Sequence, residues 1–209
     1  MYLPPQFTAK ERNQALDLMR AHPLASLISV DEASLPFVSH IPLHLEERGD
    51  QLVLLGHCAK ANPHWKYLLA RPQAVVTFMG PHAYLSPQVY PDLVRVPTWN
   101  YLAVHCTVHA HLMDDAQAKD QMLKKLIDDH EPAYAAQWQA LAPDYQQKML
   151  SGIVAFELRV ENLQCKLKLN QHRTESHASM HQMYAAGTAD EQALAVWMER
   201  LGLAISGTP

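Results

Sequence analysis

The sequence predicts an α+β protein with a mainly antiparallel β-sheet, flanking helices and a helical segment at the C-terminal end. Three apolar runs, at 24–30, 37–45 and 52–58, follow one another through short polar turns, and such a meander order is typical of antiparallel strands. A longer alternating segment at 96–109 predicts a further strand. Helix-capping patterns stand between and after the strands, the last of them at 188–191.

The composition indicates a folded protein of a reducing compartment. Of 209 residues 48% are apolar, so a sizeable core can form and general disorder is not expected. The formal net charge is −4 and the basic residues are scattered, which argues against a broad nucleic-acid-binding surface. Cys58, Cys106 and Cys165 are far apart and odd in number, so no disulfide framework is expected. Because there is no signal-peptide pattern and no apolar run of roughly 18 residues, we expect a cytoplasmic protein without a membrane span.

The first helix is predicted from a capping box. Thr8 is the expected N-cap and Glu11 the acidic residue three positions later. The helix should end near His22-Pro23, where the first strand begins. The polar segment 46–50 is the expected hairpin loop between the second and third strands.

A strand end and a helix start meet in the segment that follows the third strand. Asn62 is a favoured N-cap and Pro63 suits the first helical position, so a helix should begin here and run to about Arg71. Free amides at a helix start attract anions, and Lys60 adds a full charge. The segment is therefore a candidate anion site that needs no glycine-rich loop, and none occurs among the 7 glycines. The alternative interpretation is an ordinary capped helix beside a solvated lysine.

The long strand at 96–109 has two unlike faces. An apolar row suited to a core contains Leu102, Val104, Cys106 and Val108. The opposite row is both aromatic and polar, which suits a ligand wall or a subunit interface, although an ordinary half-buried strand has the same pattern. That row consists of Trp99, Tyr101, Ala103, His105, Thr107 and His109. Before this strand we expect a short buried strand at 74–79, a turn at Gly80-Pro81-His82 and a proline-containing loop at 87–97.

Helices and two further strands are predicted in the second half. Asp114-Asp115 should cap a helix that ends at His130, and Asp144 a short one near 144–150. A strand is expected at 153–160, and another segment begins at Cys165. In that segment Lys166, Lys168 and Asn170 share one face, which suits phosphate or a polar ring edge; a basic edge strand that discourages aggregation is the alternative. Helices at 176–186 and 188–201 complete the chain.

No catalytic group can be assigned from the sequence. His105, His109 and His111 share one strand face, but no acid or thiolate accompanies them, so we expect no metal site. The serine elbow Gly-x-Ser-x-Gly is absent, and no carboxylate pair suggests an acid and a base. Catalytic residues therefore stay unknown.

Four segments, in this order and at this spacing, resemble the PaiB-type FMN-binding split-barrel proteins, usually described as negative transcriptional regulators. The resemblance covers nearly the whole chain, to about Leu201, and His172 stands where the family pattern has Asn. The segments are Ala61-Asn62-Pro63-His64-Trp65, Gly80-Pro81-His82-Ala83-Tyr84-Leu85-Ser86-Pro87, Val96-Pro97-Thr98-Trp99-Asn100-Tyr101 and Lys166-Leu167-Lys168-Leu169-Asn170-Gln171.

The resemblance implies a six-stranded antiparallel split barrel that binds FMN at the interface of a homodimer. Residues 1–173 would form the FMN-binding domain with inserted helices, and residues 174–209 its C-terminal helical extension. By position in the family motifs, the phosphate would lie near Lys60 and Asn62 with His57 beside it. Thr98, Trp99 and Asn100 would border the ribityl chain or the isoalloxazine. Lys168 and Gln171 would be the contributors from the C-terminal strand, from the same subunit or the other one.

Three functions follow from this resemblance and from the residues. The first is an FMN-binding regulator of the PaiB type, for which direct DNA binding has little support because no helix-turn-helix pattern or basic face is present. The second is a flavin-dependent oxidoreductase, in which the flavin supplies the chemistry and no catalytic acid or base needs to stand out. The third is a split barrel that binds haem or another planar ligand, with surplus histidines such as His105 and His109 as ligands.

Overall fold

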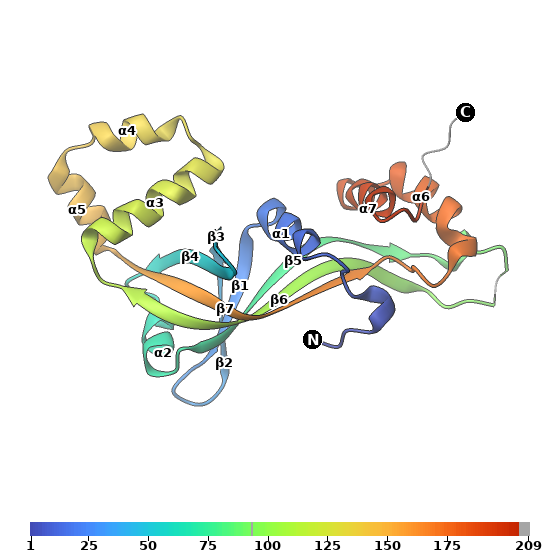
Figure 1. Ribbon diagram of the computed structural model, residues 1–209, viewed down its shortest axis with the longest axis horizontal. Coiled ribbons are helices and arrows are strands. Elements are labelled where there is room, and N and C mark those ends of the chain that lie inside the picture. The colour runs from blue at the N-terminus through green and yellow to red at the C-terminus, as the bar shows by residue number, and fades with distance from the viewer. Residues whose placement is uncertain (93, 205–209) are drawn as a thin grey trace. The chain divides into compact units, whose positions relative to one another are not determined.

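The computed structural model describes residues 1–92 and 94–204, and Figure 1 shows its helices and strands. Leu93, in the predicted loop, and residues 205–209, at the end of the predicted C-terminal extension, lie outside the described residues. The strands form one sheet of order β2-β1-β5-β6-β7-β4-β3. They are β1 (Leu24–Val30), β2 (Pro36–Pro42), β3 (His44–Arg48), β4 (Gln51–Ala59), β5 (Gln73–Leu85), β6 (Thr98–Met113) and β7 (Ile153–Lys168).

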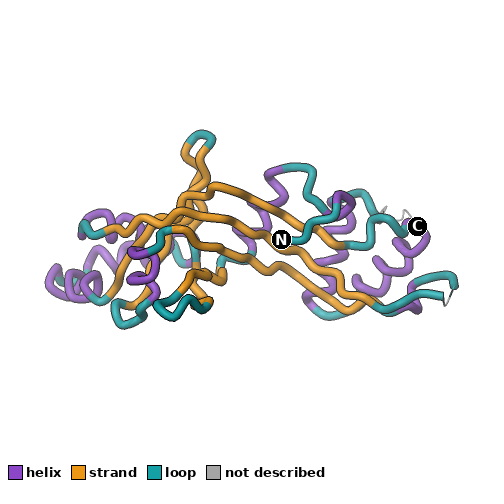
Figure 2. The backbone as a smooth tube through the Cα atoms, turned by 90° about the horizontal axis from the view of Figure 1, so that it is seen from below, coloured by secondary structure: helices purple, strands orange, loops and turns teal. Residues whose placement is uncertain are grey.

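Helices occur before, between and after the strands (Figure 2). None of the helices in the described part of the chain is long and apolar enough to cross a membrane. The α-helices are α1 (Arg12–Ala21), α2 (His64–Ala70), α3 (Ala116–His130), α4 (Tyr134–Ala140), α5 (Pro143–Ser151), α6 (His177–Ala185) and α7 (Ala189–Arg200). The short 3₁₀ helices are η1 (Pro5–Phe7), η2 (Pro87–Val89) and η3 (Thr174–Ser176).

The antiparallel character of the sheet is confirmed, but within the described residues it has seven strands because the segment expected as one strand at 37–45 is divided. Residues 36–42 pair with β1, and residues 44–48 pair with β4. Between them, the Leu43 N–H donates to the carbonyl of Pro23 at 3.0 Å, so the chain leaves one ladder before it joins the next. A strand that changes partners in this way curves the sheet toward a barrel.

Two of the expected interruptions in strands are wrong. Gly80-Pro81-His82 is not a turn, because β5 continues through it. A Cβ atom on Gly80 would lie 2.5 Å from Leu18 Cδ1 and 3.3 Å from Leu102 Cβ, so this glycine allows a close approach. Likewise, the two strands expected after residue 153 are one continuous strand, β7.

The helix caps were predicted with mixed success. Asp115 caps α3 by accepting from the Ala118 N–H, and Thr188 with Glu191 forms the expected capping box of α7. The capping box at Thr8 is wrong: α1 begins at Arg12, and the Gln14 side chain accepts from the N–H groups of residues 10 and 11. Asp144 is not a cap either, since α5 already begins at Pro143.

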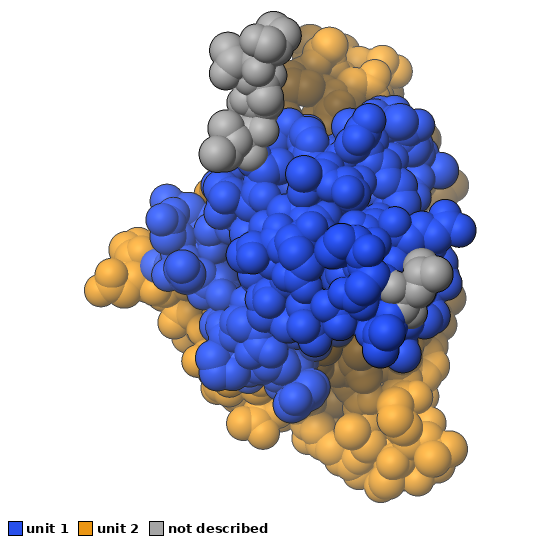
Figure 3. Space-filling view, turned by 90° about the vertical axis from the view of Figure 1, so that its right-hand side faces the viewer, with its two compact units in different colours: residues 1–18, 79–104, 164–209 blue, residues 19–78, 105–163 orange. Residues whose placement is uncertain are grey.

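The chain forms two compact units, which Figure 3 distinguishes by colour. Unit 1 contains residues 1–18, 79–104 and 164 onward, so it includes the C-terminal helices. Unit 2 contains residues 19–78 and 105–163. In unit 1, α6 and α7 pack against each other and bury Tyr184 and Met198.

In unit 2, α3 packs on the sheet around a buried apolar cluster. The cluster consists of Val53, Leu55, Met122, Leu126 and Ala155.

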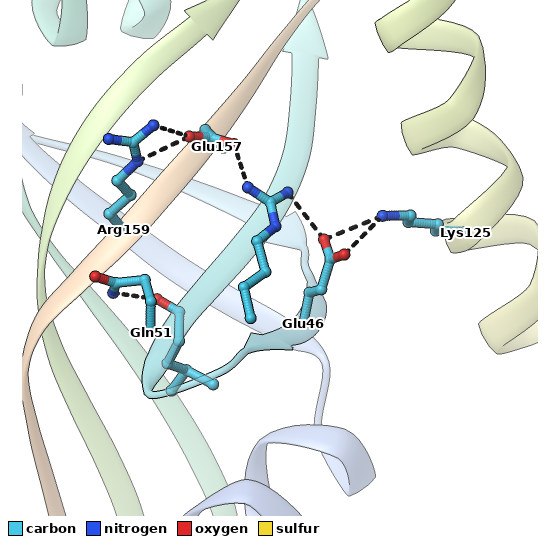
Figure 4. A network of polar contacts seen from close by, with 7 residues as sticks. Glu46, Gln51, Lys125, Glu157 and Arg159 are labelled. Carbon is cyan, nitrogen blue, oxygen red and sulfur yellow. Dashed lines mark hydrogen bonds and ion pairs between the residues drawn. The ribbon is translucent and has the colours of Figure 1, made fainter.

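An ion-pair network ties β3, β7 and α3 of unit 2 together (Figure 4). Glu46 accepts from Lys125 Nζ and from Arg48, each at 3.0 Å, and Arg48 also donates to Glu157 at 2.9 Å. Arg159 donates to the other oxygen of Glu157 at 2.9 Å. Burial alone would raise the pKa of both glutamates, but the hydrogen bonds from the neighbouring cations outweigh it, so each pKa is lowered.

Candidate functional site

The side chain of Lys168 lies at the centre of a polar cluster in unit 1. Its Nζ atom donates to Thr98 Oγ1 and to the carbonyl oxygen of Trp99, both at 2.6 Å. Burial lowers the pKa of Lys168, and the charge of Lys166 adds to this effect. The structure therefore joins three of the predicted cofactor-binding residues, from the end of β7 and the start of β6.

Aromatic side chains surround these groups. The Trp99 side chain is 53% exposed, and its ring lies 5.7 Å from the ring of His82 and 6.3 Å from that of Tyr84. We call these three residues the aromatic patch. Tyr101, two residues beyond Trp99, lies under both Lys166 and Lys168, with Nζ-to-centroid distances of 5.1 and 5.8 Å. Exposed rings beside a cation form a surface on which a planar, electron-rich ligand can stack.

Two predicted residues of unit 1 are engaged elsewhere. Asn100 is fully buried, and its Nδ2 donates to the hydroxyl of Tyr184 at 3.0 Å. Gln171 closes the turn after β7, since its Oε1 accepts from the N–H of Leu169 at 3.0 Å and its Nε2 donates to the carbonyl of Leu167. The structure thus does not bring either side chain together with Lys168.

Asn170 organises the turn after Lys168, which sequence reasoning did not foresee. Its φ of 61° lies in the left-handed region, which asparagine tolerates better than most residues. The buried side chain donates to Tyr90 Oη at 2.9 Å and to Ser176 Oγ at 3.0 Å. This residue therefore holds the end of β7 against η2 and η3, and it is not part of a basic row on the strand face.

The other three predicted residues belong to unit 2. Asn62 Oδ1 accepts from the N–H of His64 at 3.0 Å, but α2 begins at His64 and its N-cap is Pro63, so the expected cap is one residue too early. Lys60 is exposed, and its carbonyl accepts from Trp65 Nε1 at 3.1 Å. His57 is half-buried on β4, and burial lowers its pKa.

A hydrogen-bonded trio beside α2 was missed by the sequence reasoning. Ser39 Oγ accepts from Asn62 Nδ2 at 3.0 Å and lies 2.8 Å from Nδ1 of His64. His64 is fully buried, and burial lowers its pKa to about 4. Within the described residues, His64 Nε2 and His57 Nδ1 are buried without a hydrogen-bond partner. No local sequence signal marks this trio, because Ser39 lies on β2, far in sequence from Asn62 and His64 at the start of α2.

These groups fit the chemistry of FMN, which combines a planar ring with hydroxyl and phosphate oxygens. In unit 1 the exposed Trp99 ring can stack, and the Lys168 ammonium can donate to an electron-rich edge.

The histidine pair of β6 does not form a metal centre by itself. The rings of His109 and His111 lie 4.8 Å apart, and burial lowers the pKa of His105 on the same strand. Among residues 1–92 and 94–204, no group of three or more His, Cys, Asp or Glu side chains could hold a metal ion.

Solved structures with the same fold come from several organisms. The flavocytochrome Anf3 of Azotobacter vinelandii is 19% identical with a TM-score of 0.59, and the match covers 78% of this chain and 70% of that one. The FAD and heme binding protein of Mycobacterium smegmatis is 21% identical with a TM-score of 0.59, and the match covers 77% and 73%. At these identities the likeness shows the fold alone.

Sequence comparison gives the family. Residues 1–162 match the family FMN_bind_2, described as "Putative FMN-binding domain". The "Protease synthase and sporulation protein PAI 2" of Bacillus subtilis is 30% identical over 179 residues, which cover 84% of each chain. The expected split-barrel fold and the resemblance to PaiB are thereby confirmed, and the chain belongs to the FMN_bind_2 family.

Proposed function

We propose that the protein binds FMN non-covalently as a homodimer and acts as a redox-dependent regulator of the PaiB type in the cytoplasm. The observation that carries this proposal is the contact of Lys168 with Thr98 and Trp99 beside the aromatic patch. Family membership supports the choice of cofactor. When bound, FMN supplies one- and two-electron redox chemistry.

Each residue of the unit 1 cluster has a separate role in this proposal. The exposed Trp99 indole would offer a stacking surface for a planar ring. Lys168 would donate a hydrogen bond to an oxygen of the bound group and would supply a positive charge beside it. Thr98 holds the Lys168 ammonium in place. Gln171 and Asn100 act through the turn and the core, not by direct contact.

In unit 2, Lys60 and Asn62 are the proposed partners of the phosphate. Asn62 orders the chain at the start of α2, and the exposed Lys60 ammonium supplies the charge. Since α2 has only seven residues, its dipole is a smaller contribution than the charge of Lys60.

An uncharged, partly apolar sheet face supports the proposed homodimer. In unit 2, Ile28 of β1 is paired with Val38 of β2 on one side and with Val75 of β5 on the other. Two residues earlier on β1, and on the same face, Ser26 is paired with His40 and with Thr77. The apolar side chains of Val38 and Val75 are both exposed on this face. Neighbouring exposed apolar side chains are typical of a surface that another chain covers.

The first test is the visible spectrum of the purified protein, before and after heat denaturation. We expect a flavin spectrum that is released into the supernatant. Lys168→Met, Trp99→Ala and Lys60→Ala should each weaken FMN binding by about tenfold or more, as expected for loss of a charge-assisted hydrogen bond or a stacked ring. The matched control is Lys66→Ala, another exposed lysine of the α2 region. A colourless protein that does not take up added FMN would overturn the proposal.

A flavin-dependent oxidoreductase is the second candidate, favoured by the exposure of the Trp99 ring, beside which a substrate could reach the flavin. Oxidation of a nicotinamide cofactor coupled to turnover of an acceptor would identify an enzyme. Salt-sensitive binding to promoter DNA would instead identify a direct regulator. With a formal net charge of −4, we expect the regulation to be indirect.

A further inference from the structure

A second candidate binding site lies in unit 1, on the other face of β7. A cavity of about 520 Å³ that opens to solvent is lined by the segment before α1, α1 itself, the end of β7 with the turn after it, and the residues at and after the end of α7. This volume falls within the range of about 300–1,000 Å³ that is usual for small-molecule sites. Leu167 lines the cavity, whereas its neighbours Lys166 and Lys168 contact Tyr101 on the opposite face of the strand. The cavity is therefore separate from the Lys168 cluster.

One part of the cavity wall is apolar. It is formed by Leu167 from β7, by Leu201 and Leu203 from the end of α7, and by Pro5 from η1. An aliphatic or aromatic group of a ligand would be removed from water here, which stabilises binding by about 25 cal/mol per Å² of buried apolar surface.

The other part of the wall carries an excess of positive charge. Lys10 and Arg200 line the cavity together with one acidic residue, Glu11. Neither cation forms an ion pair within residues 1–92 and 94–204. An anionic group can therefore pair with both without displacing an existing carboxylate partner.

Arg200 has an aromatic neighbour, and the backbone that carries Lys10 is held by a hydrogen bond. The guanidinium of Arg200 lies 5.3 Å from the ring centroid of Trp197, one turn earlier on α7. The Lys10 backbone N–H donates to Gln14 Oε1 at 3.1 Å, which fixes the chain just before α1. Gln14 itself lines the cavity and adds an amide N–H donor.

We propose that this cavity binds a small monocarboxylate with an apolar body. The Arg200 guanidinium pairs with the carboxylate in the two-point geometry that arginine favours, and Lys10 adds a second charge. The leucine side chains cover the apolar body of the ligand. Glu11 disfavours ligands with more than one negative charge.

The test is isothermal titration with 4-methylpentanoate, which has one carboxylate and a branched apolar body. We expect saturable binding in the millimolar range or tighter, and no binding of the uncharged 4-methylpentanamide. Arg200→Gln and Lys10→Gln should each weaken binding by about tenfold or more, because each removes a charge-assisted hydrogen bond. Titration with leucine, which adds an ammonium group to the same carbon skeleton, tests whether Glu11 contacts the ligand. If it does, Glu11→Gln should lower the affinity for leucine and leave the affinity for 4-methylpentanoate unchanged.

The controls use exposed cations that do not line the cavity. Arg12→Gln and Lys148→Gln should leave the affinity unchanged. Circular dichroism identifies variants that fail to fold. Absence of saturable binding by the wild type, or equal affinity in a folded Arg200→Gln variant, would overturn the proposal. No step needs FMN, so this outcome is independent of the proposed flavin site.

Discussion

At the scale of single residues, His64 shows how burial sets protonation. The imidazole is fully enclosed beside the ring of Phe37, with a centroid distance of 5.1 Å, and its Nδ1 lies 2.8 Å from Ser39 Oγ. Since a buried charge would lose its hydration, the pKa of His64 is lowered to about 4. The neutral ring therefore shares one hydrogen bond with the Ser39 hydroxyl at Nδ1.

Protonation of His64 should make the fold sensitive to acid. Below a pH of about 6.5 the unfolded chain takes up a proton that the folded chain does not accept until about pH 4. The free energy of unfolding should fall between these values, by up to about 3 kcal/mol from this residue. His57 and His105 act in the same direction, because burial lowers the pKa of each.

Urea unfolding at a series of pH values would measure this effect. In His64→Leu the decrease in stability between pH 6.5 and pH 4 should be smaller than in the wild type. His82→Gln, which changes an exposed imidazole, should keep the wild-type slope. Equal slopes in the wild type and in His64→Leu would show that His64 is not the group responsible.

At the scale of elements, β4 is packed so closely at Gly56 that a side chain there would have to displace a neighbour. A Cβ atom on Gly56 would lie 2.5 Å from Leu43 Cδ2 and 3.3 Å from Phe156 Cε2. Leu43 and Phe156 are both buried, so neither side chain can move away into solvent. The constraint follows from the strand change at Leu43, which turns its side chain over β4.

Gly56→Ala should therefore destabilise the protein by about 1–3 kcal/mol, as is usual for overpacking in a core. The midpoint of urea unfolding measures this loss of stability, provided that the slope of the transition is the same in the variant and the wild type. Gly152→Ala is the matched control, because there a Cβ atom would meet its nearest atom at 3.4 Å, an ordinary contact. Equal effects of the two substitutions would contradict the packing argument.

At the scale of the whole molecule, the face formed by Ile28, Val38 and Val75 bears on assembly. A charge placed in a buried subunit interface is costly unless it is paired, whereas the same charge on a free surface changes little. Val38 is 48% exposed in the single chain, and Val196 on α7 of unit 1 is 47% exposed. The two valines therefore form a matched pair for a test of the proposed homodimer.

Val38→Lys should shift the protein from dimer to monomer, as measured by sedimentation velocity over a range of concentrations. Val196→Lys should leave the dimer intact. A monomeric wild type would contradict the homodimer, and a dimeric Val38→Lys variant would show that another surface forms the interface.

The sequence by itself determined the features that depend on neighbours in the chain. The alternating run Leu102, Val104, Cys106 and Val108 is buried as predicted, because residues two apart lie on the same face of a strand. The caps at Asp115 and Thr188 follow from side chains that reach backbone groups three residues away. The antiparallel pairing of the first strands also depends on neighbours in the chain, because short turns connect them.

Only the tertiary structure decided which polar side chains meet. Asn100 was predicted to border the cofactor, but it donates to Tyr184 on a distant helix, while its neighbour Trp99 faces outward. Lys168 is hydrogen-bonded to Thr98, and His64 to Ser39, and in both pairs the two residues lie on elements that are remote in sequence. A local pattern assigns a residue to a face of a strand or helix. Its partner depends on which remote segment packs against that face, and only the folded chain determines this.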